Sequence, residues 1–364
     1  GCADVVEVEG TTGAGASVVL LSHLGRPGGE VDPTLSLAPV ARRLGELARG
    51  NVDFLGATTG PEVADRVASL EAGDILLLEN TRFLAGETAN DPGLGRSLGA
   101  LADVYVNDAF GTAHRAHAST VGAARIIREA GGLAVAGLLM ERELEFLGRA
   151  LGDPKRPFVA LLGGAKISGK IDVVEALLPR VDRLLVGGAM ANTFFLALGL
   201  DVGDSLVEED RVEMARELMA RAGDRLMLPV DCRVVPEIEA GAVVRVCARD
   251  EVQAGDRIGD IGPATEVLFR NQVLEARTVV WNGPMGVFEV DGLSHGTLAV
   301  ARAVADATDD GAVSVLGGGD SAAAAEAAGV SDRLTHVSTG GGASLEFLAG
   351  ETLPGVAALS EEES

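Results

Sequence analysis

Short apolar runs alternate along this chain with stretches in which apolar residues recur every three or four positions. Residues 18–21, 52–55, 75–78 and 104–106 have the length and composition of buried strands. Residues 36–48 carry leucine or valine at 37, 40, 44 and 47, which is the spacing of an amphipathic helix. The alternation resumes at residue 158 and continues to residue 348. It predicts an α/β fold in which helices cover both faces of parallel sheets.

The length of 364 residues predicts about two domains, at roughly 150 residues each. A long predicted helix, residues 138–151, is followed by the polar stretch 152–157, which contains two prolines. A helix followed by such a stretch is typical of a semi-rigid connector between domains. We therefore place a domain boundary after residue 151 and expect a cleft between the two domains.

The charge balance is strongly acidic, with 30 lysines and arginines against 54 aspartates and glutamates and a formal net charge of −24. This argues against a general nucleic-acid binder, because phosphate backbones require a basic surface. No apolar run approaches the roughly 18 residues of a membrane helix, and the N-terminal residues lack the basic segment of a secretory signal. Three cysteines without a Cys-x-x-Cys pair favour a reducing compartment. We therefore expect a cytoplasmic protein that binds neither nucleic acid nor membrane.

Glycine-rich loops follow three of the strands predicted in the second half. They are Gly163-Gly164-Ala165-Lys166, Gly317-Gly318-Gly319-Asp320-Ser321 and Gly340-Gly341-Gly342-Ala343-Ser344. The last two loops also open predicted helices, where backbone N–H groups and the positive end of the helix dipole favour an anion. A glycine loop can also do no more than permit a tight turn. Three such loops in one predicted domain nevertheless favour a phosphate site.

Residues 164–170 match most of the phosphate-loop motif of many NTPases, Gly-x-x-x-x-Gly-Lys followed by serine or threonine. The residue after Lys170 is Ile171, which lacks the hydroxyl that binds Mg²⁺ in that motif. This mismatch argues against a P-loop NTPase. A dinucleotide-dependent dehydrogenase is also disfavoured, because no Gly-x-Gly-x-x-Gly with a distant acidic residue follows the first strand.

Basic side chains lie directly after three strands predicted in the first half. They are His23, Arg26, Arg82, His114, Arg115 and His117. Ligands of parallel sheets bind beyond the carboxyl ends of the strands, so these groups are expected to face a common ligand. In so acidic a protein, a basic cluster is suited to a small polyanion. Two of the histidines have the spacing of a metal-ligand pair, but no third ligand is evident.

Several segments that carry these residues resemble phosphoglycerate kinase, and they occur in the order found in that family. The segments are 23–27, 79–83, 107–117, 162–166, 281–289, 317–320 and 338–346, and they include the motifs NDAFGTAHRAH and WNGPMGVFE. The resemblance covers nearly the whole chain from Ser17 onward. It implies reversible phosphoryl transfer from 1,3-bisphosphoglycerate to ADP, giving 3-phosphoglycerate and ATP in glycolysis, with Mg²⁺ on the nucleotide. It also implies a monomer of two Rossmann-like three-layer domains with parallel sheets, joined by the long helix and closing by a hinge.

The resemblance further implies a role for each candidate residue. The first domain, residues 1–151 with the tail 352–364 packed back on it, would bind phosphoglycerate through His23, Leu24, Gly25, Arg26, Arg82 and Arg115. The second domain, residues 152–351, would bind the nucleotide through Lys170, Glu289, Gly318, Gly319, Asp320 and Ser321, and Asp320 would also bind Mg²⁺. The catalytic groups would be Lys166, which neutralises the phosphoryl group in transit, and the backbone N–H groups of Gly341 and Gly342.

Two features depart from the family pattern. Members of the family begin with a strand that carries an Asp-x-Asn pair and a following arginine, and residues 1–16 do not match that segment. We therefore expect a fragment or an altered N-terminus, and the alternative function is a nucleotide-binding fragment with impaired catalysis. Ile258 stands where many members have a glycine beside the adenine, and Gly259 is the candidate to replace that glycine.

Overall fold

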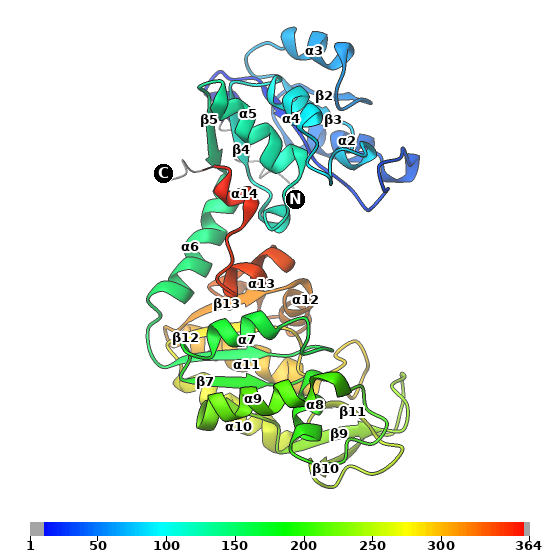
Figure 1. Cartoon of the computed structure of the whole chain (residues 1–364), viewed down its shortest axis with the longest axis vertical. Coiled ribbons are helices and arrows are strands. Elements are labelled where there is room, and N and C mark those ends of the chain that lie inside the picture. Colours follow the sequence, from blue (N-terminus) through cyan, green and yellow to red (C-terminus); the bar gives the residue numbers. More distant parts are fainter. Residues whose placement is uncertain (1–10, 360–364) are drawn as a thin grey trace. The chain divides into compact units, whose positions relative to one another are not determined.

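The computed structural model describes residues 11–359, which form two compact units. Unit 1 holds residues 11–144 together with 352–359, and unit 2 holds Glu145–Glu351. The expectations placed on residues 1–10, and on residues 360–364 of the tail, lie outside the described residues. Figure 1 follows the chain from β1 in blue to α14 in red.

The long helix predicted at 138–151 is α6 (Leu138–Gly152), and the two units divide inside it. Two backbone N–H groups at its start donate to the Asp108 carboxylate of unit 1, at 2.8 and 3.1 Å. In its last turn, the carbonyl of Leu151 accepts a hydrogen bond of 3.4 Å from Arg180 of unit 2. The division between residues 144 and 145 precedes the boundary drawn from the sequence after residue 151.

Unit 2 is built around a six-stranded parallel sheet in the order β14-β13-β12-β6-β7-β8. The strands are β6 (Phe158–Leu162), β7 (Arg183–Val186), β8 (Leu226–Met227), β12 (Thr278–Asn282), β13 (Val313–Gly317) and β14 (His336–Val337). The two central strands pair in register, with Phe158 beside Thr278 and Leu162 beside Asn282. Because all neighbours run parallel, the loops that follow β6, β12, β13 and β14 emerge side by side at one edge.

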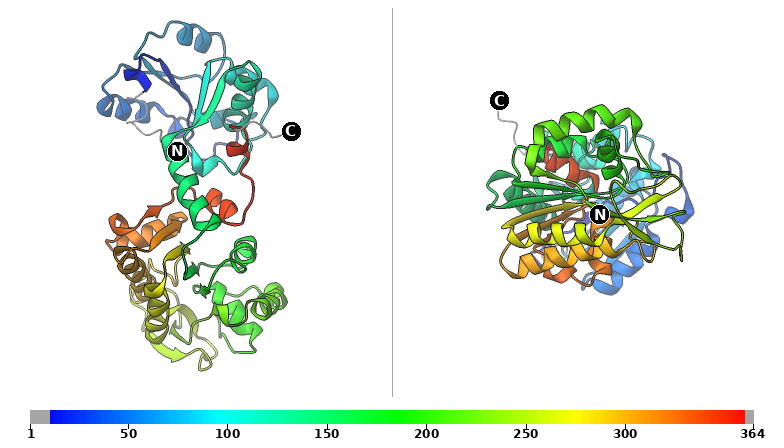
Figure 2. Two further views of the ribbon diagram at one scale, coloured as in Figure 1. Left: turned by 90° about the vertical axis from the view of Figure 1, so that its left-hand side faces the viewer. Right: turned by 90° about the horizontal axis from the view of Figure 1, so that it is seen from below.

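Helices cover both faces of this sheet, as the alternating pattern predicts. One face carries α7 (Ile171–Leu177), α8 (Met190–Ala197), α9 (Val212–Ala222) and α13 (Gly342–Leu348). The other carries α10 (Pro263–Glu275), α11 (His295–Asp309) and α12 (Gly319–Ala327). The right-hand view of Figure 2 shows the strands between these two layers. Trp281, Phe269 and Val304 lie fully buried in the core beneath the second layer.

A three-stranded antiparallel sheet in unit 2 departs from the prediction of parallel sheets alone. Its central strand β9 (Asp231–Val235) pairs with β10 (Arg245–Ala248) and with β11 (Arg257–Ile261). The connections, residues 236–244 and 249–256, are too short for the crossover of a dozen or so residues that parallel neighbours require. The register of β11 shifts at Gly259, which marks a bulge.

The described strands of unit 1 are divided between two parallel sheets. One sheet has the order β1-β3-β2, with strands Val18–Leu20, Ile75–Leu78 and Val52–Leu55, and the other pairs β4 (Val104–Asn107) with β5 (Leu133–Ala136). The helices are α2 (Ala38–Leu47), α3 (Pro61–Ala68), α4 (Pro92–Gly99) and α5 (Ala123–Glu129), with α5 beside β4 and β5 in Figure 1. Short helix α14 (Pro354–Ala357) also belongs to this unit, since Gly355 donates to the carbonyl of Ala113 at 2.8 Å.

Within residues 11–359, no helix combines the length and the apolar character that a lipid bilayer crossing would require.

Candidate active site

Two of the basic loops in unit 1 are joined by Asn80, which follows β3 and is fully buried. Its Nδ2 donates to the carbonyls of Leu24 at 2.8 Å and Leu35 at 2.9 Å, and its Oδ1 accepts the backbone N–H of Arg82 at 3.0 Å. The Arg82 guanidinium in turn donates to the carbonyl of Gly25 at 2.8 Å. The turn after β1, which carries the predicted residues 23–26, is therefore fixed against Arg82.

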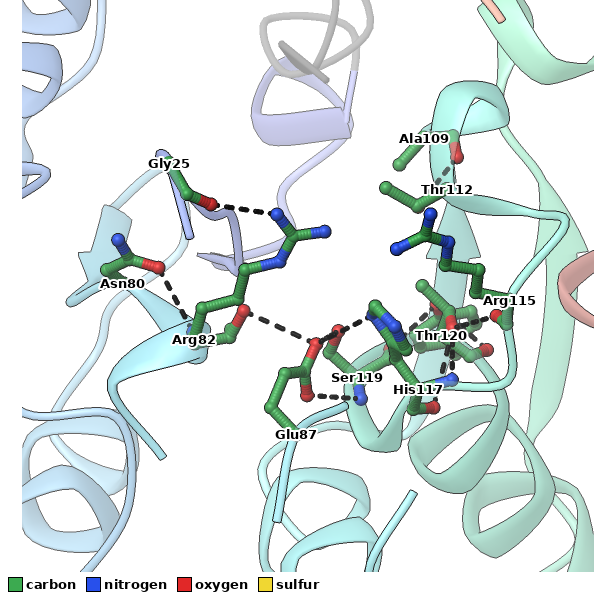
Figure 3. A network of polar contacts seen from close by, with 12 residues as sticks. Gly25, Asn80, Arg82, Glu87, Ala109, Thr112, Arg115, His117, Ser119 and Thr120 are labelled. Carbon is green, nitrogen blue, oxygen red and sulfur yellow. Dashed lines mark hydrogen bonds and ion pairs between the residues drawn. The ribbon is translucent and has the colours of Figure 1, made fainter. Parts of the chain in front are cut away.

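The third basic loop, which follows β4, is joined to the Arg82 loop by Glu87. This carboxylate accepts the backbone N–H of Ser119 at 3.0 Å and its hydroxyl at 2.5 Å. Its Oε1 also lies 3.8 Å from Nδ1 of His117. Figure 3 shows the Arg82 and Arg115 guanidinium groups reaching into the same space from opposite sides, above the carboxylate. The structure thus brings together basic residues from all three predicted loops.

The basic residues of these three loops lie close enough for their charges to destabilise the protonated form of their neighbours. Burial, then the charges of Arg115 and Arg26, lower the pKa of Arg82, and the Glu87 charge only partly opposes them. Burial and the Arg82 charge lower the pKa of His23 to about 4, so its imidazole is neutral near pH 7. In the described part of the chain, the buried Nε–H of Arg82 has no acceptor. A bound anion would supply the missing negative charge and this acceptor.

Lys170 joins three loops of unit 2 at the edge where β6, β12 and β13 end. Its ammonium donates to the Asn282 carbonyl at 3.0 Å and to the Asn282 side-chain oxygen. The Asn282 amide donates to the carbonyl of Gly317 at 2.7 Å, and the N–H of Gly283 donates to Ser321 Oγ at 2.7 Å. The predicted residues Lys170 and Ser321 are therefore held within one row of loops.

The environment of Lys170 leaves it a poorly hydrated cation. Burial lowers its pKa to about 8, although the negative charge of Asp320 works in the opposite direction. The loop glycines give the ammonium its room, since a Cβ on Gly283 would lie only 2.5 Å from Nζ. Lys166 and Asp320, in contrast, are exposed on the same rim. A desolvated cation beside glycine loops is suited to phosphate oxygens.

The loop that carries Lys166 and Lys170 is anchored by Glu208, which sequence reasoning did not find. The Glu208 carboxylate accepts the backbone N–H of Ser168 at 3.0 Å and the Ser168 hydroxyl. Burial would raise the pKa of Glu208, but these hydrogen bonds and the Lys166 charge outweigh it and lower that pKa. The loop conformation is therefore set by a carboxylate that precedes α9.

The other two glycine loops have left-handed backbone directly before their helices. Gly318 has φ +93° before α12, and Gly341 has φ +50° before α13, so both positions favour glycine. Ser338 Oγ accepts the N–H of Gly340 at 3.1 Å and lies 2.6 Å from Ser344 Oγ. Because β13 and β14 are neighbours, the predicted residues 318–321 and 341–342 lie at adjacent positions along the edge.

The β11 bulge decides which residue faces the 281–289 segment. The carbonyl of Gly259 accepts the N–H of Val287 at 2.8 Å, and a Cβ on Gly259 would lie 2.6 Å from Leu293. Ile258 instead packs against the apolar cluster of the antiparallel sheet. Glu289 follows in the same segment and is exposed. Gly259, and not Ile258, therefore lies against this segment.

No set of three or more His, Cys, Asp or Glu side chains within residues 11–359 is arranged to hold a metal ion. This includes the neighbourhood of His114 and His117, where Nδ1 of His117 faces Glu87.

Comparison with known proteins identifies the family of this chain. The family model for phosphoglycerate kinase matches residues 4–351. The chain belongs to the phosphoglycerate kinase family. Phosphoglycerate kinase of Chlorobaculum tepidum is 57% identical over 350 residues, covering 95% of this chain and 87% of the relative. That of Chloroflexus aurantiacus is 54% identical over 354 residues, covering 96% of this chain and 87% of the relative.

Solved structures of the family share the fold. Phosphoglycerate kinase from Coxiella burnetii superposes with a TM-score of 0.87 at 41% identity, over 98% of this chain and 89% of that one. The enzyme from Pyrococcus horikoshii superposes with a TM-score of 0.82 at 35% identity, over 97% of this chain and 88% of that one. The predicted two-domain, Rossmann-like α/β fold is confirmed.

The predicted activity is confirmed with the family. Phosphoglycerate kinases transfer a phosphoryl group reversibly between 1,3-bisphosphoglycerate and ADP, which gives 3-phosphoglycerate and ATP, and this reaction is part of glycolysis. The comparisons support the predicted kinase as the main function. The family match also begins at residue 4, earlier than the resemblance from Ser17.

Proposed function

We propose that the two units divide the substrates of the kinase, with phosphoglycerate bound by unit 1 and nucleotide by unit 2. The observation that carries this assignment is the presence of one group of poorly compensated cations in each unit. In unit 1, the charges of Arg115 and Arg26 both lower the pKa of Arg82, and Arg82 keeps a donor without an acceptor in the described chain. In unit 2, Lys170 is desolvated beside glycine loops.

In unit 1, the three arginines would bind the carboxylate and phosphate of 3-phosphoglycerate, because guanidinium groups suit both anions. His23 is neutral near pH 7 and would therefore bind substrate by a hydrogen bond and not as an ion. The backbone of Leu24 and Gly25 would complete this site, since Asn80 and Arg82 hold that turn in place.

In unit 2, Lys170 and the backbone N–H groups of Gly318, Gly319 and Ser321 would hold the nucleotide phosphates. Gly259 lies against the segment that carries Glu289, which supports a place for adenine and ribose along that segment. Lys166, exposed on the loop that Glu208 anchors, would neutralise the phosphoryl group during transfer, together with Gly341 and Gly342. Transfer of this kind depends on positioning and charge neutralisation more than on covalent chemistry.

Magnesium fits this arrangement through Asp320. Its carboxylate is an exposed oxygen donor in the first turn of α12, and it lies close enough to Lys170 for the two charges to interact. Mg²⁺ at nucleotide sites is bound by one or two carboxylates together with phosphate oxygens, so a cage of protein ligands is not required. When bound, the ion would neutralise charge that develops on the phosphates.

We also propose that the protein is a cytoplasmic monomer. Analytical ultracentrifugation would test its oligomeric state.

Calorimetric titration of 3-phosphoglycerate and of MgADP, each alone, tests the division of substrates. Arg82→Met should raise the Kd for 3-phosphoglycerate at least tenfold and leave the Kd for MgADP unchanged. Lys170→Met should raise the Kd for MgADP and leave the Kd for 3-phosphoglycerate unchanged. Arg43→Met and Lys155→Met remove the same charge types from exposed positions and should change neither affinity. Arg43 forms an ion pair of 2.6 Å with its helix neighbour Glu46. The assignment is wrong if Arg82→Met weakens MgADP alone.

A further inference from the structure

Glu87 is a buried carboxylate that the predicted substrate contacts do not include. Only 1% of its surface is exposed. Besides the two hydrogen bonds from Ser119, its Oε1 accepts the hydroxyl of Thr81 at 3.4 Å. His117, on its remaining side, is itself buried. The carboxylate oxygens are thus engaged by protein groups, and Figure 3 shows the carboxylate below the two guanidinium groups.

The position of Glu87 connects the two loops that carry Arg82 and Arg115. Its backbone closes a turn of the first loop through a 3.0 Å bond from its N–H to the carbonyl of Leu84. Its own carbonyl accepts the N–H of Ala118 from the second loop at 2.9 Å. The side chain then reaches the residue that follows, Ser119. Main-chain and side-chain bonds therefore fix the same pair of loops.

Burial raises the pKa of Glu87, and the hydrogen bonds from Ser119 and Thr81, together with the Arg82 charge, oppose that rise. The hydroxyls of Ser119 and Thr81 and the backbone N–H of Ser119 point at its oxygens. An acceptor-only group satisfied in this way holds its neighbours in one geometry. Its negative charge also raises the pKa of the Arg82 guanidinium, so the carboxylate stabilises that cation at a distance.

We propose that Glu87 is a positioning residue for the phosphoglycerate site, which sets the separation of Arg82 and Arg115 by tying their loops together. This inference rests on the proposed binding of phosphoglycerate by those arginines. The carboxylate and phosphate of the substrate lie a fixed distance apart, so two cations bind both ends well only at a matching separation. Glu87 acts through the loops and does not itself contact substrate.

If the role of Glu87 were purely electrostatic, removing its charge would change the affinity for substrate in the opposite direction. Removing a negative charge next to a basic site makes the site more positive, and an anionic substrate would then bind more tightly. Loss of positioning makes it bind more weakly. Glu87→Gln distinguishes the electrostatic role from the positioning role. The amide keeps the shape and one acceptor oxygen, but it removes the charge and places its NH2 group against groups that are themselves donors.

The test measures steady-state kinetics and 3-phosphoglycerate binding of Glu87→Gln in the full chain. We expect the KM and the Kd for 3-phosphoglycerate to rise about tenfold, the lower end of the effect of removing an outer-shell partner in metal sites. The kcat and the KM for MgATP should stay within about a factor of two. A lower or unchanged Kd would overturn the proposal, and so would an equal loss of affinity for both substrates.

Two further variants keep the proposal testable if Glu87→Gln folds poorly. Ser119→Ala removes one donor to Glu87 and should raise the Kd for 3-phosphoglycerate about threefold, whereas an unchanged Kd would contradict the proposal. Asp231→Asn is the matched control, since this buried carboxylate of unit 2 also accepts backbone N–H groups, from Ala264 and Thr265 at 2.9 and 2.8 Å. It should lower stability and leave the Kd for 3-phosphoglycerate unchanged.

A double-mutant cycle separates failure of this inference from failure of the proposed function. In an Arg115→Ala background there is one arginine fewer to position. Glu87→Gln should therefore raise the Kd for 3-phosphoglycerate far less in that background than in the wild type. Equal effects in the two backgrounds would show a role that is merely structural, and would overturn the inference alone. If Arg115→Ala itself leaves the Kd unchanged, the proposed binding of phosphoglycerate by this residue fails, and the inference fails with it.

Discussion

Removing the amine of Lys170 should make unit 2 more stable while it destroys nucleotide binding. The fold lowers the Lys170 pKa from 10.5 to about 8, because burial disfavours the charged form. At about 1.4 kcal/mol for each pH unit, holding this cation costs the folded state about 3 kcal/mol near neutral pH. Lys170→Met removes the cost and loses the hydrogen bonds to Asn282. The Asn282 carbonyl keeps a 2.9 Å bond from Gly163, but its side-chain oxygen loses the Lys170 donor, which costs about 1 kcal/mol. We therefore expect a net gain of about 2 kcal/mol.

The pH dependence gives the sign of this effect independently of the lost hydrogen bonds. A lysine whose pKa is lowered by folding destabilises the protein fully below its folded pKa, and the penalty disappears as the pH rises from about 8 to 10.5. The advantage of Lys170→Met over the wild type should therefore shrink by about 2 kcal/mol between about pH 7.5 and pH 10. Other titrating groups contribute equally to both proteins and cancel in the difference.

Trp281 provides the assay, since it is the only tryptophan of the chain and lies fully buried beside Asn282. Urea unfolding of both proteins, followed by tryptophan fluorescence at the two pH values, reports unit 2 directly. Lys155→Met, at an exposed lysine, should change stability at neither pH. A pH-independent difference between Lys170→Met and the wild type would refute the reasoning, even if the variant were more stable.

Three further outcomes test the packing and the buried groups of unit 2. Gly163→Ala should prevent stable folding of unit 2 or cost it several kcal/mol, because a Cβ there collides with a backbone carbonyl, whereas Gly169→Ala meets nothing and should be neutral in urea unfolding. The opposed thiols of Cys232 and Cys247 should escape alkylation until urea is added, since burial raises the pKa of both, that of Cys232 to about 12; rapid labelling of either in the native protein, seen by peptide mass spectrometry, would contradict this. Burial also raises the pKa of Asp260 from 3.8 to about 7, so its protonation stabilises the fold below about pH 4 and that contribution is lost as the pH rises to 7. The stability deficit of Asp260→Asn should therefore shrink over that range, and a constant deficit would count against the raised pKa.

The elements that the sequence predicted well are those whose signal is local. β3 and β6 are continuous apolar runs that end at a polar residue or glycine. β3 occurs at its predicted residues 75–78, and β6 begins at residue 158, where the alternation was predicted to resume. β5 was missed because Leu133–Ala136 is short and partly exposed, so it carries neither a buried run nor a regular alternation. The three antiparallel strands β9, β10 and β11 were not predicted at all, because charged residues such as Arg233, Arg245 and Asp260 interrupt their apolar runs.

The candidate site divides in the same way. Charged residues after strands and glycines before helices are visible in the sequence, because each follows from its immediate neighbours. The residues that hold them are not visible. Glu87 bonds to Ser119, 32 residues later, and Glu208 bonds to Ser168, 40 residues earlier. Such pairs exist only once distant loops are folded together, so no local pattern marks them.

The place of α14 has a consequence for the order in which a ribosome could complete the two units. Gly355 accepts a hydrogen bond of 3.3 Å from Asn107, a residue made 248 positions earlier. The Arg128 guanidinium likewise donates to the carbonyl of Ala358, which is also synthesised much later. Unit 2 ends at Glu351, so a nascent chain contains all of it before unit 1 receives its last helix. The unit that begins first is therefore finished last, and translation stopped after residue 351 would yield a complete unit 2 joined to an unfinished unit 1.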